Sequence, residues 1–267
     1  MKNEVIIITG ASSGIGKALA FALAKKGNKL VLAGRNKEKL NAVLQKMNEV
    51  NISAISIVTD VCKKEDCKNL INKCITEFGR IDVLINNAGI SMRALFNESD
   101  LEVIDKVMNT NFWGTVFCTK YALPYLLQSN GSLVGVSSIA GHIGLPERSA
   151  YSASKFAMNG FLESVRSENM ENDLHVLIAC PGFTASNIRK AALTKDGTPQ
   201  KESPRNEQKM MTAKKVAKNI ICAIDCKKDT LILSINGKFA VWLNRFFPKL
   251  AKRLVFDYFK KEKRFQK

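Results

Sequence analysis

The sequence has few of the residue types that build metal sites and disulfide frameworks. Only two histidines, His142 and His175, occur in 267 residues, and both lie far along the chain from the closely spaced cysteine pairs. The seven cysteines are odd in number and lack zinc-like spacing. We therefore expect no metal site, and we expect thiols that act as small core residues in a reducing compartment.

Long apolar runs are also missing. No stretch of 18 apolar residues occurs, which predicts no membrane-spanning helix. The first apolar run, 5–8, has four residues, a length that suits a buried strand and not the apolar core of a signal peptide. Both features indicate a cytoplasmic protein.

Acidic side chains are few relative to basic ones. The sequence has 41 Lys and Arg and 24 Asp and Glu, for a formal net charge of +17. Residues 1–186 hold 20 basic and 17 acidic residues, whereas residues 187–267 hold 21 basic and 7 acidic residues. A charge excess confined to the last third argues against nucleic-acid binding by the whole protein. We expect no nucleic-acid partner.

Short apolar segments alternate with longer amphipathic ones through most of the chain. The expected strands are 4–9, 29–34, 54–59, 81–85, 132–137, 174–179 and 230–234, and the expected helices are 14–27, 36–50, 63–78, 99–127, 150–170 and 212–225. These strands are apolar on both faces, as strands are when helices cover both sides of a sheet. We predict an α/β fold with a doubly wound, mostly parallel sheet that binds ligands at the carboxyl ends of its strands.

A glycine-rich segment follows the first expected strand and opens the first expected helix. Glycines there permit a tight turn and let the backbone approach a pyrophosphate, whose charge is favoured at a helix N-terminus. The spacing G-x-x-x-G-x-G also fits a glycine turn of no special function. The candidate nucleotide-binding residues are Gly10, Ser12, Ser13, Gly14, Ile15 and Gly16.

The second expected strand ends in Gly34-Arg35-Asn36, without a carboxylate. NAD-binding folds usually place an acidic residue near this point to hydrogen-bond the adenosine ribose. An arginine can instead form a forked pair of hydrogen bonds with a 2′-phosphate. Arg35 therefore predicts NADP(H) as the cofactor, and a solvated surface charge is the other interpretation.

Tyr151 and Lys155 are four residues apart on an expected helix, so their side chains share a face. A nearby ammonium, aided by the positive charge of an oxidised nicotinamide, lowers the pKa of a phenol and favours the phenolate. Ser138 ends the preceding strand and can orient a carbonyl oxygen toward the phenol. Residues 86–89 form a turn after another strand, and Asn111 lies in an expected helix, where an amide is a mediocre helix former.

Together these motifs resemble the short-chain dehydrogenase/reductase family in its compact single-domain form. The resemblance covers residues 4–235 and rests on TGASSGIG at 9–16, Asp60, NNAG at 86–89, Asn111, Ser138, YSASK at 151–155 and Pro181-Gly182, in this order. It implies a Rossmann-like fold, an NAD(P)-dependent oxidoreductase and assembly into homodimers or homotetramers.

The resemblance also implies a role for each matching residue. Tyr151 would donate a proton in carbonyl reduction and accept one in alcohol oxidation, and Lys155 would hold the nicotinamide ribose and lower the tyrosine pKa. Ser138 would position the substrate oxygen, and Asn111 would hold a water molecule of a proton relay. The other cofactor contacts would be Asp60 and Val61 at the adenine, Asn87, Ala88 and Gly89 at the ribose, and Pro181, Gly182 and Thr184 at the nicotinamide amide.

Residues 141–185 and the C-terminal region are similar to the dehydrogenase/reductase 7B-like branch, whose members reduce lipid-like or steroid-like carbonyls. This similarity suggests a bulky apolar ketone as the substrate. Apolar residues beside the motifs would line its pocket or simply belong to the core; they are Met92, Leu95, Phe96, Ile143, Leu145 and Phe183. The polar segment 186–211 is either a solvated loop or a substrate lid.

We assign residues 1–237 to the catalytic domain and residues 238–267 to a basic amphipathic helical extension, which Pro248 divides into two helices. Such an extension suits a peripheral membrane contact or packs on the fold or a partner subunit. The function predicted from the sequence is an NADP(H)-dependent carbonyl reductase or alcohol dehydrogenase. The alternative is a non-catalytic NADP(H)-binding sensor or scaffold that docks through the extension.

Overall fold

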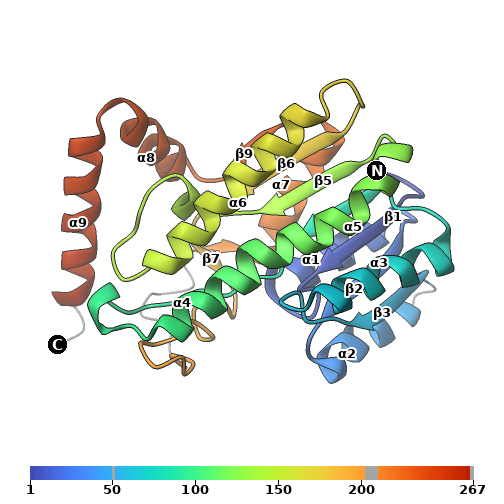
Figure 1. Ribbon diagram of the computed structural model, residues 1–267, viewed down its shortest axis with the longest axis horizontal. Coiled ribbons are helices and arrows are strands. Elements are labelled where there is room, and N and C mark those ends of the chain that lie inside the picture. Colours follow the sequence, from blue (N-terminus) through green and yellow to red (C-terminus); the bar gives the residue numbers. More distant parts are fainter. Residues whose placement is uncertain (50–51, 202–209, 265–267) are drawn as a thin grey trace.

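A parallel sheet lies at the centre of the computed structural model, which describes residues 1–49, 52–201 and 210–264 (Figure 1). Within these residues the sheet has seven strands, in the order β3-β2-β1-β4-β5-β6-β9. From β1 the chain adds strands first on one side and then, from β4 on, on the other side. The ligand-binding switch point therefore lies between β1 and β4. The strands are β1 Val5–Thr9, β2 Lys29–Gly34, β3 Ala54–Val58, β4 Val83–Asn86, β5 Ser132–Val136, β6 His175–Cys180 and β9 Thr230–Ile232.

Helices cover both faces of this sheet, which explains why its strands are apolar throughout. Along β1, Ile6 and Ile8 face one hydrophobic cluster, whereas Val5 and Ile7 face the other. The first cluster lies under α1 (Gly14–Ala24), α2 (Lys37–Asn48) and α7 (Ala213–Asp225), and the second lies under α3 (Lys64–Phe78), α5 (Gly114–Gln128) and α6 (Ser149–Glu168). The predicted doubly wound α/β fold is confirmed.

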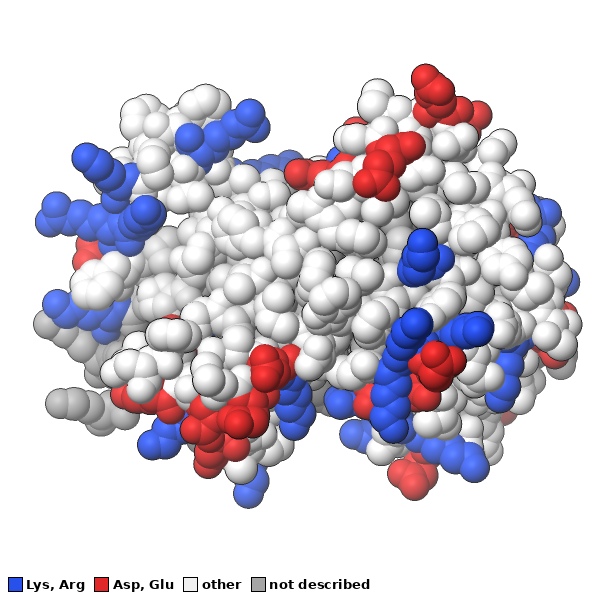
Figure 2. All heavy atoms as spheres, viewed as in Figure 1, with Lys and Arg blue, Asp and Glu red and all other residues white. Residues whose placement is uncertain are grey.

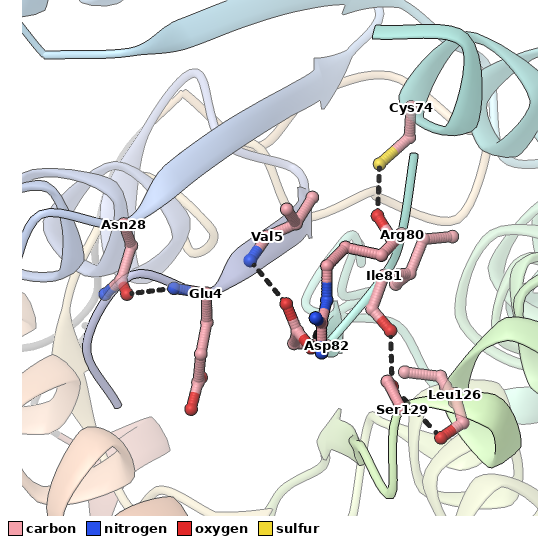
Figure 3. Close-up of polar contacts among 9 residues, drawn as sticks. All are labelled: Glu4, Val5, Asn28, Cys74, Arg80, Ile81, Asp82, Leu126 and Ser129. Atoms are coloured by element: carbon pink, nitrogen blue, oxygen red, sulfur yellow. Dashed lines mark hydrogen bonds and ion pairs between the residues drawn. The ribbon is translucent and has the colours of Figure 1, made fainter. Parts of the chain in front are cut away.

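A buried carboxylate fastens the amino-terminal edge of the sheet, opposite the ligand-binding edge (Figure 3). Asp82 precedes β4 and accepts a hydrogen bond from the Val5 amide at 2.8 Å, which ties β4 to β1. The same carboxylate accepts hydrogen bonds from Nε and Nη2 of Arg80 at 3.0 and 2.6 Å. Asp82 thus satisfies the first amide of the central strand.

The helix predicted over 99–127 is confirmed, and it contains a π-helical turn. It consists of α4 (Leu101–Met108), the π-helical turn at Asn109–Trp113 and α5, and its backbone stays helical throughout. The π-helical turn includes Asn111, whose buried side chain is held by residues outside the helix. Such π-turns frequently occur at functional sites.

Two helices follow β9 and stand at one end of the molecule, beyond the sheet (Figure 1). They are α8 (Ile235–Phe246) and α9 (Pro248–Arg264), and α9 begins at the proline where the sequence predicts a division. Among the described residues, no helix has the length and apolarity needed to cross a bilayer.

Candidate active site

Thr9, the last residue of β1, joins the loops on both sides of the switch point. Its Oγ1 accepts hydrogen bonds from the amides of Asn87 and Ala88 at 2.9 and 3.0 Å. The Asn87 side chain returns a hydrogen bond from Nδ2 to the Thr9 carbonyl at 2.8 Å. The glycine-rich loop after β1 and the turn after β4 therefore form one connected surface.

The glycine-rich loop is a compact turn that opens directly into α1. Gly10 and Gly14 have φ angles of 66° and 55°, values that side-chain-bearing residues rarely adopt. A Cβ atom on Gly16 would lie 2.3 Å from the Gly10 carbonyl oxygen, so only glycine fits there. Ser13 is the N-cap of α1, but its side chain does not cap the helix, which leaves first-turn amides available to an anion.

Arg35 and Asp60 lie at the carboxyl ends of the next two strands. Arg35 is exposed immediately after β2, and its neighbour Gly34 approaches the glycine-rich loop closely, since a Cβ there would lie 3.6 Å from Ser12 Oγ. The Asp60 carboxylate accepts a hydrogen bond from the Cys62 amide at 3.2 Å. Val61 is buried against the start of α5. The residues predicted to hold the adenosine end of a nucleotide thus line one edge.

Tyr151, Ser138 and Lys155 meet at the carboxyl end of β5. Tyr151 and Lys155 lie on α6, with Lys155 Nζ 5.9 Å from the centre of the Tyr151 ring. Ser138 follows β5 and lies near enough to the Tyr151 phenol to lower its pKa. Lys155 is only 3% exposed, and its Nζ donates to the Val136 carbonyl at 2.9 Å. The structure therefore brings together the three side chains that the motifs predict to act in one reaction.

The pKa values of this group are set mainly by burial. Burial raises the pKa of Tyr151, although the Ser138 hydrogen bond and the Arg148 charge act to lower it. Burial lowers the pKa of Lys155 to about 8.

Asn111 lies beside this group but uses its side chain to hold the backbone. Its Nδ2 donates to the Ile90 carbonyl at 3.0 Å and to Ser154 Oγ at 2.9 Å, and its Oδ1 accepts from the Ile90 amide at 2.8 Å. A Cβ on Gly89 would lie 3.1 Å from Asn111 Oδ1 and 3.7 Å from Lys155 Nζ. These contacts show Asn111 clamping the turn after β4 against α6.

The loop after β6 closes the other side of the site. Cys180 Sγ lies 3.3 Å from Nε2 of His142, and Thr184 Oγ1 donates to the Gly182 carbonyl at 3.1 Å. Thr184 and Ala185 form the short strand β7, which pairs with β8 (Met211–Thr212). The two ends of the segment 186–211 are thereby joined. Part of that predicted lid, 202–209, lies outside the described residues.

The six candidate substrate residues differ in exposure. Met92 and Ile143 are buried, and Met92 packs in a cluster that also contacts Tyr151. Leu95, Phe96 and Phe183 are exposed, and Leu145 is half-buried. Leu95 also borders a pocket of about 390 Å³, whose other lining residues are Arg93, Ala94, Glu98, Glu147, Thr194, Lys195 and Gln200. The described part of the lid borders this pocket, and Leu193 pairs there with Met92.

Sequence reasoning assigned no role to Thr9, Arg148 or Ser154. Thr9 is visible within the TGASSGIG motif, and Ser154 lies three residues after Tyr151 on the same helix face. The effect of Arg148 on Tyr151 depends on the fold, since an arginine before a helix has no distinctive spacing. The strand order and the open first turn of α1 define the class of protein, a doubly wound α/β protein with a loop suited to an anion at its switch point.

Comparison with known proteins identifies the family. A family model described as short chain dehydrogenase matches residues 4–197. The chain therefore belongs to the short-chain dehydrogenase/reductase family of oxidoreductases, as its motifs predict.

The similar proteins include members of two named groups. The chain is 42% identical over 188 residues to 11-beta-hydroxysteroid dehydrogenase 1A of Arabidopsis thaliana, which covers 70% of this chain and 54% of that protein, so the chain spans about half that relative's length. It is 34% identical to dehydrogenase/reductase SDR family member 7B of Xenopus laevis, over 94% of this chain and 80% of the relative.

A solved structure confirms the fold. A short-chain dehydrogenase/reductase from Burkholderia phymatum in complex with NAD superimposes with a TM-score of 0.85, at 23% identity, over 93% of this chain and 95% of that one.

Proposed function

We propose that the protein is an NADP(H)-dependent oxidoreductase that interconverts a carbonyl group and an alcohol, with Tyr151 as the general acid/base. The observation that carries the proposal is the meeting of Tyr151, Ser138 and Lys155 beside the glycine-rich loop. Geometry of this kind suits proton transfer to a carbonyl oxygen that Ser138 also hydrogen-bonds.

The chain's own residues suit a dinucleotide. The close packing of Gly16 against Gly10 and the open first turn of α1 fit a pyrophosphate. Val136 accepts one of the three ammonium donors of Lys155, and the others suit ribose hydroxyls. Arg35, exposed directly after β2 at the same edge of the sheet, suits a 2′-phosphate. When bound, the nicotinamide supplies the hydride chemistry.

Each catalytic side chain then has one task. In the reductive direction the protonated Tyr151 phenol donates its proton to the substrate oxygen, and Ser138 holds that oxygen in place. The positive charge of Lys155 stabilises the phenolate that remains after the proton has been donated. Asn111 and Ser154 keep the turn after β4 in register with α6, which fixes the distance between the cofactor-binding and proton-donating groups.

The test is Tyr151→Phe, with Tyr125→Phe on α5 as a matched control. We expect Tyr151→Phe to abolish NADPH-dependent carbonyl reduction while NADPH affinity stays nearly unchanged, because the phenol contributes chemistry more than binding. Tyr125→Phe should retain turnover. Unchanged turnover in Tyr151→Phe would refute the mechanism, whereas wild-type protein that binds NADPH but reduces no carbonyl would favour the non-catalytic sensor or scaffold.

The substrate we propose is a bulky apolar ketone. Leu95, Phe96 and Phe183 are large apolar side chains exposed on loops at the ligand-binding edge, which is where a ligand would bury them. NADPH oxidation measured with keto lipids, steroids, quinones and small ketones tests this. Preference for small polar ketones would contradict it.

The face over α5 and α6 supports assembly into a homodimer or homotetramer. Figure 2 shows few charged side chains over this part of the molecule. Trp113 and Phe156 are exposed there, and Trp113 stacks on Phe117 at 5.6 Å. Trp113→Lys should shift the wild-type oligomer toward monomer in light scattering, whereas Met170→Lys, at an exposed control position, should not. A monomeric wild type would contradict the proposal.

The extension supports peripheral contact with an anionic membrane. Figure 2 shows basic side chains gathered over α8 and α9, and large apolar side chains are exposed between them. The exposed apolar residues are Phe239, Trp242, Phe246, Phe247, Leu250 and Leu254. Trp242→Ala should weaken sedimentation with phosphatidylserine-containing vesicles, and Met170→Ala should not. Equal sedimentation of both variants would refute the contact.

A further inference from the structure

Helix α8 packs directly on the loop that carries Ser138. A Cβ atom on Gly237 of α8 would lie 2.0 Å from Ile139 Cδ1, so the helix and this loop are in close contact. About two turns later, Asn244 Nδ2 donates a hydrogen bond to the His142 carbonyl at 3.0 Å. The short helical turn Ile139–Gly141 after Ser138 is therefore held at both ends by the same helix.

The start of α8 also reaches the loop after β6. Ser234 is the N-cap of α8, and its Oγ accepts a hydrogen bond from the Gly237 amide at 3.0 Å. A Cβ atom on Gly182 would lie 3.0 Å from that same Oγ. The two loops that border the reacting end of the site thus share one helix as their support.

Helix α9 touches the other side of the site through one aromatic ring. Phe259 is 8% exposed, whereas Phe256, on the same helix, is 58% exposed. The ring of Phe259 lies 5.8 Å from the guanidinium carbon of Arg148, within the range of a cation–π contact. Arg148 is itself buried, and its carbonyl accepts the Ser152 amide in the first turn of α6 at 2.8 Å.

Arg148 stands where it can act on the proton donor. It is the N-cap of α6 and lies three residues before Tyr151. Its neighbour Glu147 has a φ of 62° and pairs with Arg93 at 2.9 Å, which fixes the backbone that enters the helix. A change in how Phe259 covers Arg148 would therefore shift the start of α6, and with it the phenol.

We propose that α8 and α9 are positioning elements of the active site, in which Asn244 holds the Ser138 loop and Phe259 holds Arg148 at the start of the Tyr151 helix. The inference rests on the proposed function, since it concerns the positions of the groups that carry out that reaction. It makes the extension part of the catalytic structure as well as a candidate membrane surface.

The test compares Phe259→Leu with Phe259→Tyr and with the control Phe256→Leu. Misplacement of a reacting group by a fraction of an ångström costs rate more than binding, so Phe259→Leu should lower kcat about tenfold with NADPH affinity unchanged. Phe259→Tyr keeps an aromatic face for Arg148 and should retain most of the wild-type kcat. Phe256→Leu should match the wild type.

Asn244→Ala tests the α8 contact in the same way, with Asn219→Ala on α7 as its control. Hydrogen exchange of residues 138–143 and 149–155 supplies a readout that does not depend on turnover, and it should quicken in Asn244→Ala and Phe259→Leu respectively. Wild-type kcat and wild-type exchange in both variants, with Tyr151→Phe inactive, would overturn this inference alone. If wild-type protein reduces no carbonyl, the proposed function fails, and the exchange measurement still decides whether the two helices hold these loops.

Discussion

Replacing Arg35 with aspartate should reverse the nucleotide preference of the protein. Arg35 is exposed directly after Gly34, the last residue of β2, at the edge of the sheet where the glycine-rich loop also lies. An aspartate at this place would repel a 2′-phosphate and could accept hydrogen bonds from a free ribose hydroxyl. The substitution thus removes an attraction and adds a repulsion for NADPH, while it adds a contact for NADH.

The size of the effect follows from the exposure of the arginine. A hydrogen bond to a charged group contributes about 1.5–3 kcal/mol, and the solvent around Arg35 favours the lower end of that range. At about 1.4 kcal/mol per factor of ten, loss of the arginine alone should weaken NADPH binding about tenfold. The added carboxylate should bring the total loss to about a hundredfold at low salt, and added salt should reduce it.

The assay is titration of nucleotide fluorescence with wild type, Arg35→Asp and the control Lys37→Asp, at two salt concentrations. Lys37 is a second exposed cation, in the first turn of α2, and the control carries the same change in net charge. Equal affinity of the wild type for NADH and NADPH would refute the assignment. An equal loss in Lys37→Asp would show that general charge, and not a contact of Arg35, attracts the phosphate.

Three further predictions concern stability and the glycine-rich loop. Burial lowers the pKa of Lys155 to about 8, so the unfolded chain holds that proton more tightly than the folded protein does. The unfolding free energy of wild type relative to Lys155→Met, measured by urea denaturation, should therefore rise between about pH 8 and the ordinary lysine value near 10.5. A difference that does not change with pH would contradict the burial of a charged amine. Asp82→Ala should lower the unfolding free energy by about 2 kcal/mol, because it leaves the Val5 amide unpaired, whereas Asp257→Ala on α9 should change it little. Gly16→Ala should weaken NADPH binding at least about tenfold and lower the melting temperature, because its Cβ would meet the Gly10 carbonyl oxygen at 2.3 Å; Gly160→Ala, at an open position of α6, is the control, and equal behaviour of the two would refute the packing argument.

The strands of the sheet are predictable from the sequence because each is a short, mainly apolar segment bounded by turn residues or polar residues. Residues 29–34 and 230–234 both illustrate this, and the structure differs there by at most two residues. The π-helical turn at Asn109–Trp113 is not predictable in the same way. It depends on the hydrogen bonds between Asn111 and the distant residues Ile90 and Ser154. The helix propensities of residues 109–113 do not reveal these contacts.

Some residues of the candidate site are also predictable from the sequence, and others are not. Tyr151 and Lys155 are predictable because helix periodicity alone places them on one face. Arg148 and Phe259 are 111 residues apart in the sequence, and their contact depends on how α9 returns to the body of the protein. The direction of the Tyr151 pKa shift likewise depends on the fold, because charges can be read from the sequence but the degree of burial cannot.

The raised pKa of Tyr151 determines which protonation state is present at the start of the proposed reaction. Burial outweighs both the Ser138 hydrogen bond and the Arg148 charge, so the Tyr151 phenol is protonated at neutral pH. A protonated phenol is the form that donates to a carbonyl oxygen, whereas alcohol oxidation begins from the phenolate. Lys155, buried beside it with a lowered pKa, stabilises the phenolate once the proton has left. In the proposed reaction, carbonyl reduction thus begins from the resting form of Tyr151, whereas alcohol oxidation first requires the phenol to lose its proton.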